Sequence, residues 1–227
     1  TQEYAIISNC FTVFNMDFRP ILKRHIQTGC DITEVRQRGK SLEMYLVKTS
    51  LLIELVKSKD VTGYYCMRDV VSGVHHPYQI CTYEYDGYAE MIDSIQSYFA
   101  VSNDMLKPQI WKSLFQKNQP IYTKVKDEPP TKYLKTANVQ HSMIANGCQI
   151  EGIVENSIIS RAVKIGKGSI IKNSIIMQKS QIGDNCILDS VILDKDVKIE
   201  PGTVMIGSSK LPYVVRKGVV QGALMKS

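Results

Sequence analysis

The cysteines and histidines of the chain are the residue types best suited to metal binding or nucleophilic catalysis. The six cysteines stand singly, without a CxxC pair, so they show no zinc-site spacing. Scattered thiols of this kind are typical of reduced, buried side chains in a cytosolic protein. The four histidines form no cluster either, and we expect no metal centre. These residues are Cys10, Cys30, Cys66, Cys81, Cys148 and Cys186, with His25, His75, His76 and His141.

A repeated six-residue pattern dominates the chain after about residue 140. Segments 165–170, 182–187 and 199–204 each begin with isoleucine and follow one another at intervals of 17 residues. Aliphatic residues at this spacing predict short strands whose side chains face inward, and Gly, Asn or Asp at the turns tolerate a positive φ. The repeat therefore predicts a left-handed parallel β-helix of three to four coils between about residues 143 and 207.

The first half of the chain alternates short apolar runs with helical patterns. Such alternation predicts an α/β domain with a Rossmann-like, mixed and mainly parallel sheet. We expect Asp17 to cap the first helix, and Thr49 and Ser50 to cap the second. The predicted strands are 4–8, 31–35, 43–47 and 79–84, and the predicted helices are 18–28, 51–57, 94–106 and 109–116.

These patterns divide the chain into three segments. Residues 1–118 form the α/β part, the proline-bearing stretch 119–140 is a crossover linker, and 141–227 form the β-helix. The chain lacks an initiator Met and enters an apolar run at once, so we expect it to begin inside a longer fold. The first residues lack the basic-then-apolar layout of a signal peptide, and no run reaches the roughly 18 apolar residues of a membrane span. The sequence predicts a cytoplasmic protein.

The net charge of +6 is mild for a chain of 227 residues. Basic residues gather at 23–25 and 36–40, but no aromatic residues are interleaved with them. Nucleic-acid binding sites usually combine both features, so we expect no nucleic-acid partner and no membrane partner.

The order of α/β domain, crossover and short β-helix resembles the ADP-glucose pyrophosphorylase (glucose-1-phosphate adenylyltransferase) family. The likeness is most detailed in 142–177 and 192–207, and 119–123 is similar to the family's crossover. Upstream, 15–18 resembles its x-Met-Asp-Tyr helix entry, and 41–46 resembles its Ser-Met-Gly-x-Tyr strand near the sugar. The resemblance implies that the N-terminal part of a family chain, with its ATP loop, belongs before residue 1.

The chain differs from this family at the positions of the metal ligands and of the lysine that holds the sugar phosphate. The resemblance implies Mg²⁺ held by two aspartates, yet an ungapped alignment puts Phe11 and Met91 at those positions. An aromatic ring and a thioether do not replace the oxygen ligands of Mg²⁺. Asp17 and Asp93 lie nearby out of register, and Asp93 is the alternative ligand if the alignment is shifted. The lysine segment that holds the sugar phosphate is replaced by 36–40, which is long enough only for a turn.

This pattern is similar to the non-catalytic, regulatory-type subunit of the family in bacterial glycogen biosynthesis. The resemblance implies no catalytic residue and no cofactor in this chain, with Mg²⁺ bound by an active subunit. It implies a catalytic partner subunit, a hetero- or homotetramer, and a sugar-phosphate effector. Ser41 is expected to be a remnant of the substrate site. The candidate anion binders for the effector are Arg161, Lys164 and Arg216.

Three other functions stay open. The chain is an active sugar-1-phosphate nucleotidyltransferase if its ATP loop and metal ligands lie outside it or are misaligned. Hexapeptide β-helices also occur in acyltransferases, which use a histidine as general base. Here His141 precedes the repeats and none lies within them, which disfavours that reading. A structural scaffold is the third alternative.

Overall fold

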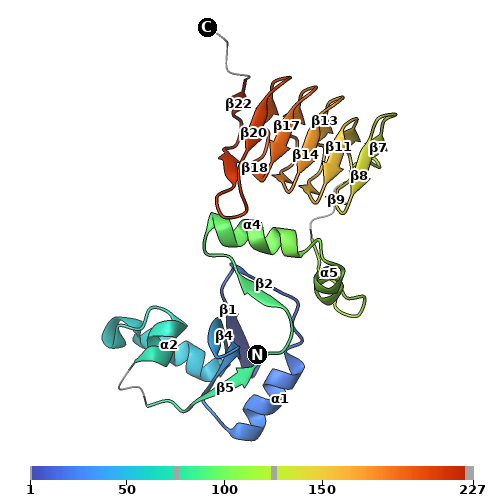
Figure 1. The fold of residues 1–227 in the computed structure, drawn as a ribbon. Helices are drawn as coiled ribbons and strands as arrows, with labels where there is room; N and C mark the ends of the chain where they lie inside the picture. The colour runs from blue at the N-terminus through green and yellow to red at the C-terminus, as the bar shows by residue number, and fades with distance from the viewer. Residues whose placement is uncertain (1, 74–76, 124–126, 223–227) are drawn as a thin grey trace. The chain divides into compact units, whose positions relative to one another are not determined.

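The structure is a computed structural model and describes residues 2–73, 77–123 and 127–222. In it the chain divides into two units. One unit contains Thr1–Met91 and Ser113–Ile121, and the other contains Ile92–Lys112 and Tyr122–Ser227. His75 and His76 lie outside the described residues. The order of the helices and strands confirms the predicted fold class, an α/β part followed by a hexapeptide β-helix (Figure 1).

A four-stranded sheet in the order β1-β4-β3-β5 forms the centre of the first unit. A separate two-stranded ribbon pairs β2 with β6. Asn15 ties the returning segment to this unit, because its Nδ2 donates to the carbonyls of Leu114 and Gln119 at 2.6 and 2.9 Å. The elements are β1 (Tyr4–Ser8), β2 (Thr12–Phe14), α1 (Arg19–Thr28), β3 (Ile32–Gln37), β4 (Lys40–Lys48), α2 (Thr49–Thr62), α3 (Met67–Ser72), β5 (Ile80–Glu84) and β6 (Ala89–Met91).

The expected mainly parallel sheet is wrong. β4 runs antiparallel to both β1 and β3, and only β3 and β5 are parallel. The reason is local: Arg38 and Gly39 take φ of 50° and 74° and form a two-residue turn between β3 and β4. So short a turn joins only antiparallel strands. Residues 36–40 do form the predicted turn.

Two predicted helix caps are also wrong. The N-cap of α1 is Phe18 rather than Asp17, although Oδ1 of Asp17 accepts a hydrogen bond from the Arg19 backbone N–H at 3.0 Å. The N-cap of α2 is Lys48, so Thr49 and Ser50 belong to the first turn of the helix. Neither Phe18 nor Lys48 makes a side-chain cap hydrogen bond.

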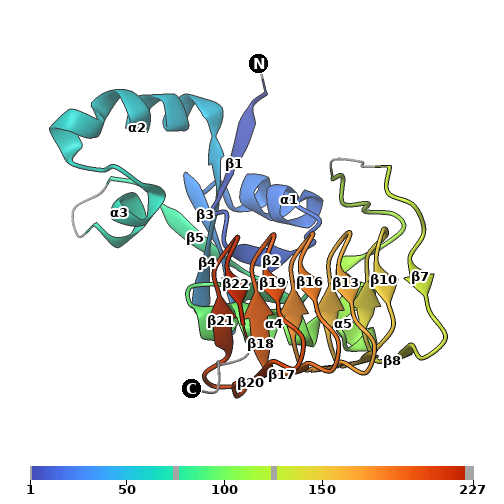
Figure 2. The same ribbon diagram turned by 90° about the horizontal axis from the view of Figure 1, so that it is seen from above.

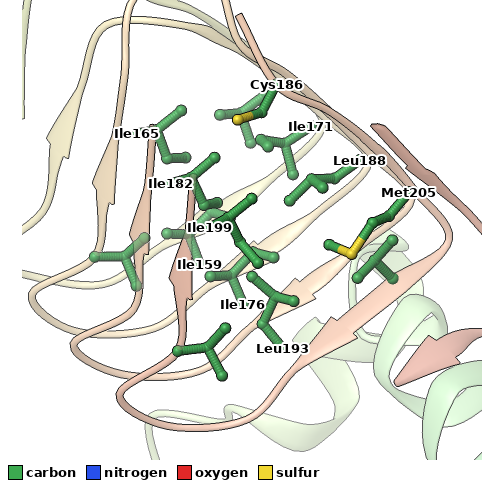
Figure 3. Packing of buried hydrophobic residues seen from close by; sticks show 14 of the residues in the cluster. Ile159, Ile165, Ile171, Ile176, Ile182, Cys186, Leu188, Leu193, Ile199 and Met205 are labelled. Atoms are coloured by element: carbon green, nitrogen blue, oxygen red, sulfur yellow. The ribbon is translucent and has the colours of Figure 1, made fainter. Parts of the chain in front are cut away.

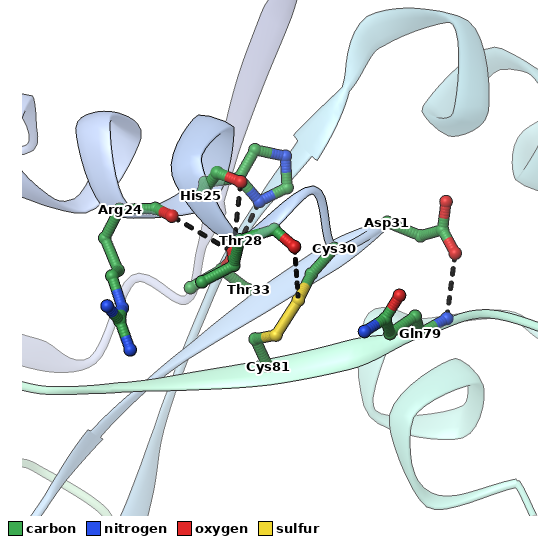
Figure 4. Close-up of a disulfide and its surroundings, with 8 residues drawn as sticks. All are labelled: Arg24, His25, Thr28, Cys30, Asp31, Thr33, Gln79 and Cys81. Carbon is green, nitrogen blue, oxygen red and sulfur yellow. Dashed lines mark hydrogen bonds between the residues drawn. A yellow bond between two sulfur atoms is a disulfide. The ribbon is translucent and has the colours of Figure 1, made fainter.

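Cys30 and Cys81 form a disulfide between the start of β3 and β5, which corrects the expectation of reduced thiols (Figure 4). Cys10 and Cys66 are exposed, so only Cys148 and Cys186 match the predicted buried free thiols. The two bonded cysteines are 51 residues apart, and only the pairing of β3 with β5 brings them together.

The second unit is a parallel solenoid with three flat faces. The first face has six strands: β7 (Lys132–Tyr133), β10 (Gln149–Ile150), β13 (Lys164–Ile165), β16 (Gln181–Ile182), β19 (Lys198–Ile199) and β22 (Val220–Gln221). The second face has five: β8 (Asn138–Gln140), β11 (Ile153–Glu155), β14 (Ile170–Lys172), β17 (Ile187–Asp189) and β20 (Val204–Ile206). The third face has five: β9 (Met143–Ile144), β12 (Ile158–Ile159), β15 (Ile175–Ile176), β18 (Val191–Leu193) and β21 (Tyr213–Val215).

The predicted 17-residue register is confirmed by the strand pairing. Ile165 pairs with Ile182, and Ile182 pairs with Ile199, so equivalent side chains stack from coil to coil (Figure 3). Ile171 pairs with Leu188 in the same way. These side chains are at most 3% exposed and belong to one continuous apolar core. Their burial is the main favourable contribution to the stability of the solenoid.

The corners of the solenoid take the expected left-handed backbone conformation. Asn156, Asn173 and Gly168 have φ of 47°, 46° and 69°, as residues tolerant of positive φ should. Ala162 and Lys179 also have positive φ, of 57° and 62°, without any turn signal in the sequence. The register of the neighbouring coils therefore imposes the corner there.

Buried serines join successive coils at one corner. Oγ of Ser157 accepts a hydrogen bond from the Ser174 backbone N–H at 3.0 Å, and Oγ of Ser174 accepts one from the Val191 N–H at 3.1 Å. The Ser174 hydroxyl donates to the Lys172 carbonyl at 2.6 Å. Ser157 and Ser174 are fully buried, so each hydroxyl satisfies backbone groups that water does not reach.

Helix α4 (Ile95–Asp104) belongs to the unit of the solenoid. Ser94 caps it, because Oγ of Ser94 accepts a hydrogen bond from the Ser97 N–H at 3.1 Å. Phe99 of α4 packs with Ile175 and Ile192 of the third face. Helix α5 (Pro108–Leu114) follows it. No helix in the described ranges has the length and apolar content needed to cross a membrane.

We predict that Ser174→Ala lowers the free energy of unfolding by about 1–3 kcal/mol, because the Val191 N–H is then buried without a partner. Urea unfolding followed by circular dichroism measures this. Ser208→Ala, in an exposed loop, is the control and should change stability by less than about 0.5 kcal/mol. Equal effects of the two changes would contradict the role given to the buried hydroxyl.

We predict that stability falls as the pH drops below about 6.5 because of His25. The side chain is 2% exposed, and its Nδ1 lies 2.7 Å from Thr33 Oγ1. Desolvation, with a contribution from Lys48, lowers the pKa of His25. The unfolded chain therefore binds a proton in a pH range where the folded chain does not.

Urea midpoints at pH 7.5 and 5.5 measure this effect. His25→Gln should show a smaller loss between the two values than the wild type, while His141→Gln, at an exposed position, should not. An unchanged pH dependence in His25→Gln would show that another group is responsible.

Candidate functional site

Of the two positions at which the resemblance implies metal-binding aspartates, Phe11 directly precedes β2 and Met91 is the last residue of β6. β2 and β6 form an antiparallel ribbon in which Thr12 pairs with Met91. Phe11 directly precedes Thr12, and its backbone N–H donates to Oδ1 of Asn9 at 3.0 Å. Phe11 and Met91 therefore meet at one end of the ribbon, with an aromatic ring and a thioether where the resemblance implies carboxylates.

The residues at this end of the ribbon do not fit the Mg²⁺ that the resemblance implies, because Mg²⁺ requires oxygen ligands. Asp17 is paired with Arg19, whose Nη2 lies 2.7 Å from Oδ2, and hydrogen bonding to Arg19 lowers the pKa of Asp17. Asp93 is exposed and belongs to the other unit, where its backbone N–H donates to Ser97 Oγ at 3.0 Å. Among the described residues, no group of three or more His, Cys, Asp or Glu is placed to hold a metal ion.

Strand β4 contains an irregularity beside Ser41. Val35 pairs with Met44 but Arg36 pairs with Ser41, so two residues of β4 bulge out of the ladder. Ser41 Oγ accepts a hydrogen bond from the Glu43 N–H at 3.1 Å, which holds the bulge. Bulges of this kind re-aim side chains next to functional sites.

Glu43, within the bulge, has φ of 52°, a left-handed conformation that is uncommon for a residue with a side chain. It stands at the Gly position of the Ser-Met-Gly-x-Tyr motif, and its carboxylate forms an ion pair with Arg68 of α3. Both residues line a cavity of about 200 Å³ with Asn9 and Tyr45. Burial raises the pKa of Tyr45, which also shares a hydrogen bond with Ser41.

Sequence reasoning missed Glu43 and Arg68. A glutamate at the glycine position of the motif was the signal that could have identified Glu43. Arg68 is 25 residues away and had no signal of its own, because only the fold places α3 beside the bulge. The structure thus places Ser41, which accepts a hydrogen bond from the Glu43 N–H, next to a cavity lined by a carboxylate and a guanidinium.

The three candidate anion binders lie on separate parts of the solenoid. Lys164 pairs with Gln149 and Gln181 on the first face, beside a shallow groove of about 410 Å³. Arg161 follows β12 and Arg216 follows β21, and these strands are three coils apart on the third face. At about 4.8 Å per coil, some 14 Å separate the two arginines along the solenoid. Their role towards an effector stays a prediction.

A family model and several curated proteins match the chain. The family model, described as GlmU-like, C-terminal hexapeptide, matches residues 129–211. Glycogen biosynthesis protein GlgD of Bacillus subtilis (strain 168) is 52% identical over 227 residues, which are 100% of this chain and 66% of that protein. Glycogen biosynthesis protein GlgD of Geobacillus stearothermophilus is 57% identical over 224 residues, 99% of this chain and 65% of that protein. The chain is a close homologue of GlgD.

The GlgD relatives are longer than the chain, which spans 66% and 65% of their lengths. A more distant match is glucose-1-phosphate adenylyltransferase of Thermosipho africanus (strain TCF52B), which is 31% identical over 134 residues. That match covers 58% of this chain and 32% of that protein. The resemblance to the glucose-1-phosphate adenylyltransferase family is thus confirmed, with GlgD proteins as close homologues.

We predict that Glu43→Gly is more stable than Glu43→Ala by about 1 kcal/mol, because both lose the Arg68 ion pair but only glycine takes a positive φ without strain. Urea unfolding of the two variants measures the difference. The same pair of changes at Glu90, in β6, should show the opposite order, because glycine weakens an ordinary strand. If Glu43→Ala equals or exceeds Glu43→Gly in stability, the bulge stores no strain at Glu43.

Proposed function

We propose that the protein is a catalytically impaired, regulatory subunit of a glucose-1-phosphate adenylyltransferase assembly in glycogen biosynthesis. Its partner in this proposal is a catalytic subunit of the same family, in a heterotetramer. The observation that carries the proposal is the pairing of β2 with β6, in which Met91 is opposite Thr12, the residue that follows Phe11. Neither Phe11 nor Met91 supplies an oxygen ligand, so this end of the ribbon does not support in-line transfer assisted by Mg²⁺.

The bulge of β4 supports the same proposal. The resembling motif has a glycine, which has no side chain, two residues after the serine, whereas here the Glu43 side chain and its ion pair with Arg68 form part of the cavity wall. The Arg68 guanidinium, a group that suits a phosphate, is ion-paired with Glu43, so the pair offers no net positive charge to the phosphate of a sugar phosphate. The chain is therefore poorly suited to hold the substrate that an active subunit would bind.

The proposed role in regulation requires an effector site, for which Arg161, Lys164 and Arg216 are the candidates. Each carries a positive charge that suits a sugar phosphate. Arg161 and Arg216 lie too far apart along the solenoid for one small anion, so we propose that Lys164 or either arginine acts together with residues of the partner. The proposal places the assembly in the cytoplasm.

The test is pyrophosphate release from ATP and glucose-1-phosphate in the presence of Mg²⁺. The full-length protein alone should turn over at less than about one thousandth of the rate of the catalytic subunit, because a missing metal forfeits several kcal/mol of transition-state stabilisation. Mixing it with the catalytic subunit of the same organism should change the rate or the effector response. An equal mass of an unrelated protein is the control.

Turnover by the lone protein at a rate comparable to that of the catalytic subunit would contradict the proposal. It would favour an active nucleotidyltransferase whose metal ligands lie elsewhere. If the protein alone releases no pyrophosphate and does not change the rate or effector response of the catalytic subunit, a structural scaffold is favoured instead.

A further inference from the structure

The three faces of the solenoid differ in what their outward side chains present. On the first face, which ends with the exposed Val220 of β22, the outward residues of the other strands, β7, β10, β13, β16 and β19 (Figure 2), are exposed and polar, as expected of a surface in water. They are Lys132, Gln149, Lys164, Gln181 and Lys198.

The third face presents apolar residues outward, and a helix covers them. Ile175 and Ile192 pair on neighbouring strands and are only 2% and 4% exposed, because Phe99 of α4 packs against both. The third face therefore gives an example within this unit of an outward apolar row that is buried by an apolar side chain of another element.

The second face carries the same kind of row, and none of the described residues of its own unit covers it. Ile153, Ile170, Ile187 and Val204 stand in register on the successive strands β11, β14, β17 and β20, which are labelled in Figure 1. Ile153, Ile187 and Val204 are 38%, 41% and 58% exposed. A contiguous apolar row on a flat sheet marks an interaction surface, in contrast to scattered single apolar residues. We call these four residues the isoleucine row.

A row of charges runs beside the isoleucine row. Glu155, Lys172, Asp189 and Ile206 follow one another in the same register, and Lys172 Nζ lies 3.1 Å from Glu155 Oε2. The charges alternate in sign from coil to coil, and the exposed Ile206 ends the row. The order is therefore negative, positive, negative and apolar.

We propose that the second face binds a second copy of this chain, face to face and with the solenoids antiparallel. The twofold axis that relates the two copies lies between the facing sheets, parallel to the strands and midway between β14 and β17. It preserves the direction of the strands and reverses the order of the coils. Ile170 then faces Ile187 of the second copy, and Ile153 faces Val204 of the second copy. Lys172 faces Asp189 of the second copy, twice by symmetry, so the isoleucine row and these two charges are complementary to themselves. Glu155 faces Ile206 of the second copy and keeps its ion pair with Lys172 of its own chain.

Neighbouring positions of the axis do not match both rows. An axis between β11 and β14 also places Lys172 opposite a carboxylate, that of Glu155, but it places Ile187 opposite Asn138 of the second copy. An axis through β14 would place Lys172 opposite Lys172 of the second copy, and one through β17 would do the same for Asp189. The contact is small, and interfaces below about 1,200 Å² are weak, so we expect a dissociation constant in the range of about 1–100 μM. The inference does not depend on the proposed function.

Sedimentation equilibrium of the full-length protein tests the proposal. We expect a concentration-dependent dimer, and Ile187→Lys should raise its dissociation constant about tenfold or more by burying an unpaired charge in the apolar row. Gln181→Lys, an outward change on the polar first face, is the matched control and should leave the constant unchanged. Circular dichroism melting of each variant separates lost association from lost folding.

A charge exchange identifies the partner as a second copy. Lys172→Glu alone should weaken the dimer by opposing Asp189, and Lys172→Glu with Asp189→Lys should restore it. Dimerisation unaffected by Ile187→Lys, or a monomer at all concentrations, would overturn the proposal. Binding of the catalytic subunit at this face without self-association would overturn it too, and would leave the proposed regulation intact.

Discussion

The register between successive coils of the solenoid is the constraint on which the second unit depends. Ile182 stacks on Ile165 and Ile199 stacks on Ile182, each 17 residues after its partner, and buried serine hydroxyls such as that of Ser174 bind the backbone of the next coil. This register fixes the alternation of inward and outward side chains on all three faces. The polar first face, the row covered by α4 and the exposed isoleucine row therefore all follow from one repeat.

The α/β unit depends on a different feature, the pairing of strands that are distant in the sequence. β2 and β6 bring Phe11 and Met91 to one end of a ribbon, and the bulge in β4 directs Glu43 towards Arg68. At both places the backbone arrangement suits a functional site while the side chains lack the expected chemistry. Charge and ligand type, rather than backbone geometry, support the proposal of a regulatory role.

The sequence was sufficient to predict the features that repeat or alternate locally. The 17-residue echo of Ile165, Ile182 and Ile199 specified the solenoid, because equivalent residues in a repeat must stack. It was also sufficient to show that Phe11 and Met91 lack oxygen ligands, since ligand chemistry is a property of the residue type.

Features that depend on tertiary contacts could not be predicted in this way. The antiparallel hairpin at Arg38 and Gly39 was missed because helix–strand alternation was given more weight than the short turn. The apolar residues of α4 indicated that one face of the helix is buried, but the sequence did not identify Ile175 and Ile192 as the residues it packs against. Arg68 and the disulfide between Cys30 and Cys81 arise from segments that only the folded sheet brings together.

Manganese binding followed by electron paramagnetic resonance tests the central claim, that the chain lacks the metal site of an active subunit. The full-length protein should bind no Mn²⁺ at this ribbon at millimolar concentrations. The variant Phe11→Asp with Met91→Asp should gain a site, because the two positions are neighbours on β2 and β6. Wild-type protein that binds one Mn²⁺ per chain as tightly as this variant would contradict the account, and a variant that gains no binding would contradict the placement of both positions in one site.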